Sequence, residues 1–120
     1  MEADQPGAGR AADPTVLDEI VRRVVEVSHP ERIILFGSAA RGELGPDSDY
    51  DLLVVKSDVA HRRRLAQAIH LNLFGVGVPV DIIVVTPDDI DFARDRVGSI
   101  IGPALREGRE IYAAADARPE

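Results

Sequence analysis

The chain has 120 residues, no cysteine and a formal charge of −7, from 14 basic and 21 acidic residues. This length supports one domain with a single core, and the missing cysteines exclude disulfide scaffolds, thiolate metal sites and cysteine nucleophiles. The acidic balance argues against direct binding to nucleic acid or to anionic lipid, and no apolar run approaches the roughly 20 residues that cross a bilayer. We therefore expect a soluble, cytoplasmic protein with no membrane segment.

The first elements follow from capping and apolar spacing. Residues 1–12 are rich in Gly, Ala and Pro without periodicity, so we expect a disordered lead-in there. Asp13 is a candidate N-cap before Pro14, and apolar residues then recur at helical spacing until about residue 28. The unbroken apolar run over 32–36 predicts a strand that is covered on both faces.

Two further strands are predicted over 50–56 and 78–86, where β-branched and apolar residues dominate. Between these strands, apolar residues at helical spacing predict a helix over 58–73. Either Ser57 or Asp58 can cap that helix.

The last part of the domain is predicted to be mainly helical. Thr86 and Pro87 supply an N-cap and a first helical residue, and a helical stretch extends to Glu107 with a break near Gly98 or Pro103. The element order then implies an α/β or α+β domain, a small sheet flanked by helices.

Gly108 should stop the last helix, and residues 109–113 are expected to form an edge strand. The folded domain is thus expected to span 13–113, followed by a flexible tail over 114–120.

Three carboxylates lie in or next to strand segments whose other residues are mostly apolar and are expected to be buried. Asp51 and Asp81 lie within apolar strand segments, and Asp49 lies two residues before Asp51, so it shares a face with it. If the two strands are neighbours, the three side chains converge and repel each other unless a cation is present. Mg²⁺ suits such oxygen ligands, and a pair of ions suits nucleotidyl transfer. Taken singly, each aspartate is more often a turn former or a cap than a metal ligand.

A glycine and a hydroxyl follow the first strand. Gly37 permits a sharp turn and the close approach of a phosphate, Ser38 can donate to phosphate oxygens, and Arg41 can reach the same anion. A strand-ending glycine and a turn-capping serine explain the same residues without any ligand.

Gly37 and Ser38, ten further residues, and then Asp49, Tyr50 and Asp51 form the pattern G-S-x10-D-x-D. With Asp81 on a later strand and the closing segment EGREIY over 107–112, residues 14–113 resemble the minimal nucleotidyltransferases of the polymerase-β-like superfamily. The resemblance implies a mixed sheet flanked by helices. It also implies that Asp49 and Asp51 hold Mg²⁺, that Asp81 is the third metal-site carboxylate and readies the attacking hydroxyl, and that Gly37 and Ser38 hold the triphosphate of ATP.

Members of this size are often antitoxins paired with an all-helical HEPN ribonuclease toxin. The resemblance implies transfer of AMP to a tyrosine of that toxin. The short chain leaves no room for an added acceptor domain, so we expect a partner or a second copy of the chain to complete the site. A non-catalytic binding antitoxin is one alternative, and transfer to a small molecule such as an aminoglycoside is another. The basic run over 61–64 is interpreted as a solvated helix face, with a nucleotide or partner contact as the alternative.

Overall fold

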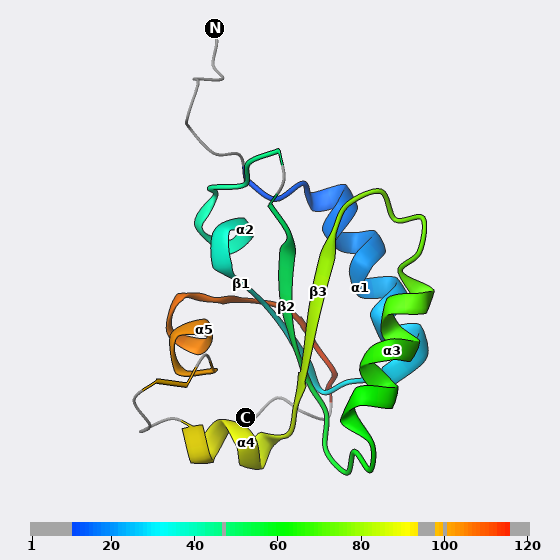
Figure 1. The fold of residues 1–120 in the computed structure, drawn as a ribbon, viewed down its shortest axis with the longest axis vertical. Coiled ribbons are helices and arrows are strands. Elements are labelled where there is room, and N and C mark those ends of the chain that lie inside the picture. Colours follow the sequence, from blue (N-terminus) through cyan, green and yellow to red (C-terminus); the bar gives the residue numbers. More distant parts are fainter. Residues whose placement is uncertain (1–10, 47, 94–97, 100, 116–120) are drawn as a thin grey trace, which may run out of the picture.

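The computed structural model describes residues 11–115, except for 47, 94–97 and 100. Its helices are α1 (Pro14–Ser28), α2 (Gly37–Arg41), α3 (Arg62–Asn72), α4 (Pro87–Ala93) and α5 (Ile101–Glu107) (Figure 1). Its strands are β1 (Arg32–Phe36), β2 (Tyr50–Val55), β3 (Val80–Val85) and β4 (Arg109–Ala113). All four of these strands were predicted from the sequence.

The four strands form one mixed sheet in the order β3-β2-β1-β4. The neighbouring strands β2 and β3 run parallel and are joined through α3, whereas β1 pairs antiparallel with both β2 and β4. The predicted small mixed sheet flanked by helices is confirmed, and so is the expectation that the second and third strands are neighbours.

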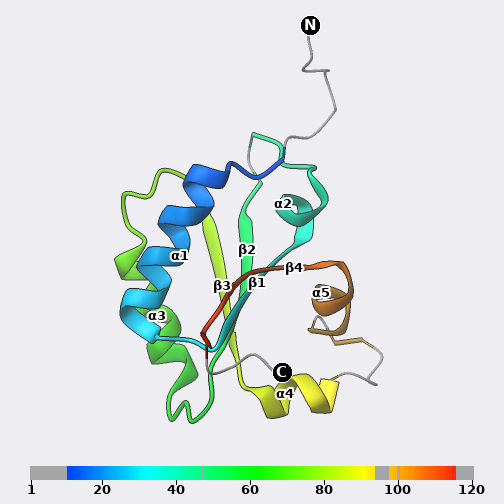
Figure 2. The same ribbon diagram turned by 180° about the vertical axis from the view of Figure 1, so that it is seen from behind.

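Helices cover both faces of the sheet. α1 and α3 lie on one side, and α2, α4 and α5 lie on the other, as the two opposite views show (Figures 1 and 2). Apolar side chains alternate along β1, β2 and β3 between these two layers, because successive residues of a strand point to opposite faces. Ile33, Leu52 and Ile82 belong to the core under α1 and α3. Ile34 and Leu53 belong to the smaller core under α4 and α5.

The predicted helix starts at Asp13 and Thr86 are confirmed by their caps. The Thr15 N–H donates to Asp13 Oδ1 at 2.9 Å, which satisfies one of the free donors at the start of α1. At α4 the Asp89 N–H donates to Thr86 Oγ1 at 3.1 Å, and the Thr86 N–H donates back to Asp89 Oδ2 at 2.9 Å. This reciprocal pair is a capping box.

The predicted start of the middle helix is wrong. α3 begins at Arg62, and neither Ser57 nor Asp58 caps it. Asp58 has a φ of 59°, a left-handed conformation that cannot continue into a right-handed helix, so the chain makes a loop first. Of the two predicted breaks, Pro103 lies inside the first turn of α5, where its missing N–H costs nothing. The interruption falls nearer Gly98, which has a φ of 93°.

The predicted lead-in and tail lie mostly outside the described residues, so the domain limits at 13 and 113 stay predictions. Ala12, however, is buried and belongs to the core under α1 and α3. None of the helices in the described part of the chain is both long and apolar enough to cross a membrane.

Candidate functional site

The three predicted carboxylates lie on one face of the sheet. Asp51 of β2 and Asp81 of β3 are direct partners in the parallel register. Both share the face of Leu53 and Val55, which is the face that carries α4 and α5. Asp49 immediately precedes β2 and lies two residues before Asp51, which directs it to the same side. Asp49 and Asp81 are exposed, whereas Asp51 is half-buried.

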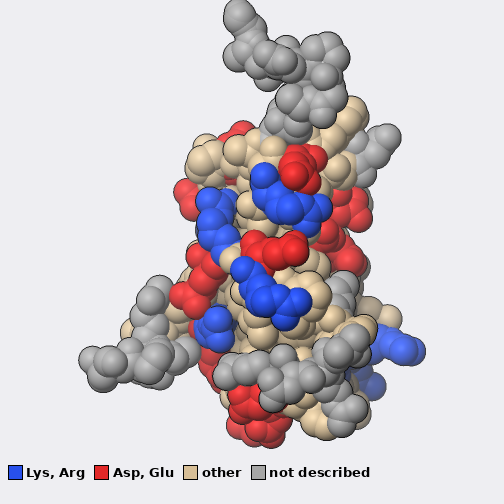
Figure 3. Space-filling model, turned by 90° about the vertical axis from the view of Figure 1, so that its left-hand side faces the viewer, with Lys and Arg blue, Asp and Glu red and all other residues tan. Residues whose placement is uncertain are grey.

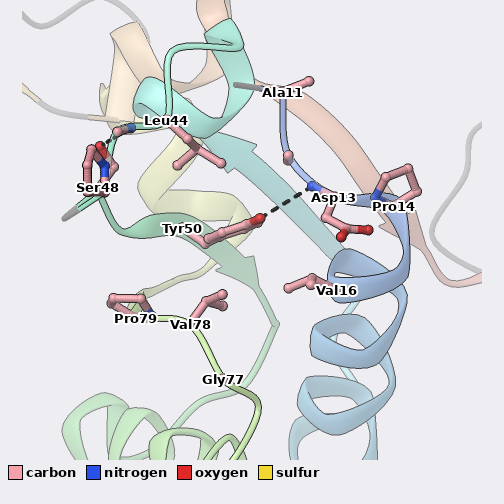
Figure 4. A pocket seen from close by; sticks show the side chains of 13 residues that line it. Ala11, Asp13, Pro14, Val16, Leu44, Ser48, Tyr50, Gly77, Val78 and Pro79 are labelled. Carbon is pink, nitrogen blue, oxygen red and sulfur yellow. Dashed lines mark hydrogen bonds between the residues drawn. The ribbon is translucent and has the colours of Figure 1, made fainter. Parts of the chain in front are cut away.

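The residue between the two aspartates points the other way. Tyr50 is buried in the core on the α1 side, and its hydroxyl accepts a hydrogen bond from the Asp13 N–H at 3.3 Å. Tyr50 and Ser48 line a cavity of about 840 Å³ between the start of α1 and the loop before β3 (Figure 4). That cavity therefore lies behind β2, on the side opposite to the three carboxylates, as the alternation along the strand predicts.

The electrostatics of Asp51 depend on its burial and on the two other aspartates. Partial burial raises the pKa of Asp51, and the nearby charges of Asp81 and Asp49 raise it further, while the charge of Arg41 lowers it. The carboxylates thus repel each other in the folded protein. A bound cation would remove this repulsion, so the donor set suits a hard divalent ion with oxygen ligands.

In the part of the chain that the structure describes, no three His, Asp or Glu side chains form a ready-made metal cage.

Gly37 is the residue that brings the backbone of α2 against Asp51. The preceding residue, Phe36, is the register partner of Asp51, and Gly37 has a φ of 71°, which side chains rarely adopt. A Cβ atom at position 37 would overlap Asp51 Oδ2 and lie 3.3 Å from Asp51 Cγ. Glycine is therefore needed here both for the turn and for the space that the carboxylate occupies. Ser38 follows as a half-buried residue of α2.

Arg41 is the last residue of α2 and lies in an exposed ion-pair network. Its Nε donates to Glu43 Oε1 at 2.9 Å, and its Nη1 donates to Glu107 Oε1 at 3.3 Å. These carboxylates raise the pKa of the guanidinium. Basic and acidic side chains alternate over this side of the molecule (Figure 3). The anion contact predicted for Arg41 stays a prediction.

The sequence did not reveal the two partners of Arg41. Glu43 lies only two residues away, but its spacing matches no motif. Glu107 lies 66 residues further along the chain, so only the folded arrangement brings it to α2.

The basic run over 61–64 lies at the start of α3 with its side chains exposed, as the solvated-face interpretation requires. Arg62 pairs with Asp89 of α4. Lys56, His61 and Arg64 line a cavity of about 360 Å³. Lys56 follows the end of β2 that lies far from Asp49 and Asp51, so this basic group is remote from the carboxylates.

Comparison with known proteins places these features in a family. A family model described as "nucleotidyltransferase domain" matches residues 17–106. No curated protein matches the chain.

Solved structures share the fold. A toxin-antitoxin MntA-HpeT mutant is 17% identical with a TM-score of 0.53, over 83% of this chain and 75% of that one. A toxin-antitoxin structure with AMP-PNP is 20% identical with a TM-score of 0.52, over 82% and 75%. A protein from Sulfolobus solfataricus described as a candidate nucleotidyltransferase is 28% identical with a TM-score of 0.51, over 69% and 75%.

Proposed function

This chain belongs to the nucleotidyltransferase domain family, and we propose that it transfers AMP from ATP to a hydroxyl of a partner protein. The observation that carries the proposal is the pairing of Asp51 with Asp81 across two parallel strands, directly beside the glycine that begins α2. Such a carboxylate pair is costly for a surface that only binds another protein, because its charges repel each other. It is explained by a reaction that needs a cation.

In the proposed reaction Asp49, Asp51 and Asp81 provide the carboxylates of the metal site, with Asp49 and Asp51 as the main ligands of Mg²⁺. When bound, Mg²⁺ neutralises phosphate charge and stabilises the attacking and leaving oxygens. Asp81 accepts the hydrogen bond of the acceptor hydroxyl and takes up its proton. The hydroxyl oxygen forms a bond to the α-phosphorus, the bond to the bridging oxygen breaks, and pyrophosphate leaves. The chain contributes mainly positioning and charge.

The triphosphate is proposed to lie against the turn from β1 into α2. Gly37 allows the close approach there, and the Ser38 hydroxyl and the Arg41 guanidinium donate to phosphate oxygens. The structure with AMP-PNP among the relatives supports a nucleoside triphosphate as the substrate. Another similar structure is that of a mutant in which two aspartates, two positions apart, are replaced by glutamate. Asp49 and Asp51 have the same spacing.

We further propose that the acceptor is a tyrosine of a helical HEPN-type ribonuclease, so that the chain acts as an antitoxin. Three similar solved structures are toxin-antitoxin structures, which supports a toxin as the partner. Asp49 and Asp81 are exposed, so an acceptor side chain from another molecule can reach them.

Mass spectrometry of the partner tests this function. After incubation with this chain, ATP and Mg²⁺, the partner toxin should gain the mass of one or more AMP groups and lose ribonuclease activity. Inhibition without a mass change would identify a binding antitoxin. Transfer of AMP to an aminoglycoside but not to the toxin would support nucleotidyl transfer and show that the acceptor is a small molecule.

Nucleotide binding should depend on Mg²⁺. Without the cation, the triphosphate and the carboxylates of Asp49 and Asp51 repel each other, so we expect binding to weaken by about tenfold or more. Calorimetric titration with a non-hydrolysable ATP analogue, in Mg²⁺ and in EDTA, measures this difference. Equal affinity in both buffers would contradict the proposed metal bridge.

A further inference from the structure

The short helix α2 depends on contacts with the rest of the chain. Five residues are too few to form a stable helix alone. Ala39 is buried, and Gly42 ends the helix in a left-handed conformation with a φ of 73°. The Glu43 N–H then donates to Ser38 O at 2.8 Å. These contacts hold the backbone of α2, but they do not determine where the long side chain of Arg41 points.

The side chain of Glu107 is exposed, but its backbone is held in place by close packing of the next residue. The next residue, Gly108, is pressed against β1, where a Cβ atom would overlap Ala104 O and lie 2.7 Å from Ile34 Cγ2. α5 also packs against α2. The end of α5 is thus fixed relative to the sheet, and Glu107 reaches Arg41 from a defined position.

The two carboxylates leave most of the guanidinium available. Glu43 and Glu107 each accept one hydrogen bond, from Nε and Nη1. An arginine side chain has five N–H donors in a rigid fork, so the others can serve a phosphate. Two acceptors that come from different parts of the chain restrict the rotation of the fork. Arg41 lies four residues after Gly37 on the same short helix, which packs against β2 and abuts Asp51, so the guanidinium is on a helix that borders the carboxylate site.

We propose that Glu107 is a positioning residue that orients Arg41 toward the triphosphate. This inference rests on the proposed function and adds a residue from the C-terminal part of the domain to it. Exposed ion pairs contribute little to stability. The 3.3 Å contact therefore matters for the direction of the guanidinium and not for holding the fold together.

The decisive measurement is the affinity for a non-hydrolysable ATP analogue with Mg²⁺. We expect Glu107→Gln to raise the dissociation constant by about three- to tenfold. This is the effect expected when the charge-assisted hydrogen bond between Arg41 and the triphosphate is weakened but not lost. Glu110→Gln is the matched control, because Glu110 also pairs with an arginine, Arg32, at 3.0 Å. The control should bind the analogue like the wild type. Both variants should unfold at the wild-type temperature.

A double-mutant cycle shows whether Glu107 acts through Arg41. In an Arg41→Ala background, Glu107→Gln should have no further effect on affinity. Equal effects in both backgrounds would overturn the proposal, and so would unchanged or tighter binding by Glu107→Gln alone. In the transfer assay the change should fall on the KM for ATP, with kcat preserved.

The binding assay needs no acceptor, so the two proposals fail in different ways. If the wild type binds the analogue but Glu107→Gln does not weaken it, only the positioning role is overturned. If the wild type fails to bind the analogue at all, the proposed function is overturned and the positioning role with it.

Discussion

Replacing Asp51 with asparagine should abolish nucleotidyl transfer and, without metal, stabilise the folded protein. The amide side chain would retain the size of the carboxylate but lose the charge that we propose holds the cation, so we expect the rate to fall by about 10³-fold or more. The same change removes a carboxylate whose burial and neighbours disfavour its charged form. Loss of activity with a gain in stability distinguishes a functional charge from a structural one.

The sign of the stability effect follows from the raised pKa of Asp51. The folded protein binds this proton more tightly than the unfolded chain, so the carboxyl group costs stability as the pH rises from the ordinary aspartate pKa through the raised one. Thermal unfolding in EDTA at neutral pH should therefore give a higher midpoint for Asp51→Asn than for the wild type. Added Mg²⁺ should raise the midpoint of the wild type only.

Asp18→Asn provides the control, because Asp18 is exposed on α1, on the other side of the sheet. It should change neither transfer nor the response to Mg²⁺. A variant Asp51→Asn that unfolds at a lower temperature than the wild type in EDTA would contradict the repulsion argument.

Replacing Gly37 with alanine should damage both stability and nucleotide binding. The positive φ of 71° costs an L-residue about 1–2 kcal/mol. The overlap of the new Cβ with the Asp51 carboxylate should add about 1–3 kcal/mol, as for overpacking of a filled site. Because the methyl group would displace Asp51 or α2, the proposed metal-binding carboxylate and the proposed phosphate-binding turn would no longer fit together.

Gly75→Ala separates these two contributions. Gly75 also has a positive φ, 87°, but a Cβ there would meet nothing within 4 Å. Urea denaturation should show a small loss of stability for Gly75→Ala and a larger one for Gly37→Ala. Only Gly37→Ala should lose affinity for the ATP analogue. Equal losses of stability in both variants would show that the contact with Asp51 is unimportant.

Local signals in the sequence predicted most of the elements. The caps at Asp13 and Thr86 and the apolar strand runs are visible without the fold, because their energetics involve neighbours in the chain. The start of α3 was missed because the left-handed conformation of Asp58 has no reliable signal in the sequence. Aspartate serves equally well as a cap and as a left-handed loop residue.

Part of the candidate site could also be predicted from local signals in the sequence, and part could not. The period of two along a strand directed Asp49 and Asp51 to one face, and the apolar surroundings of Asp81 marked it as unusual. Its direct pairing with Asp51 could not be predicted, since register depends on how two strands meet. The contact between Arg41 and Glu107 could not be predicted either. It joins two exposed residues of opposite charge, and any sequence contains many such possible pairs.

The pairing of Asp51 with Asp81 also has a consequence for how the sheet assembles. A shift of β3 by one residue would turn every side chain to the opposite face. Asp81 would then enter the core under α1 and α3, and Ile82 and Val84 would leave it. An unpaired charge in an apolar core is severely destabilising. The acid that we propose for the reaction thus penalises misaligned assembly. A chain that folds with β3 in the wrong register would lose both its stability and the proposed site.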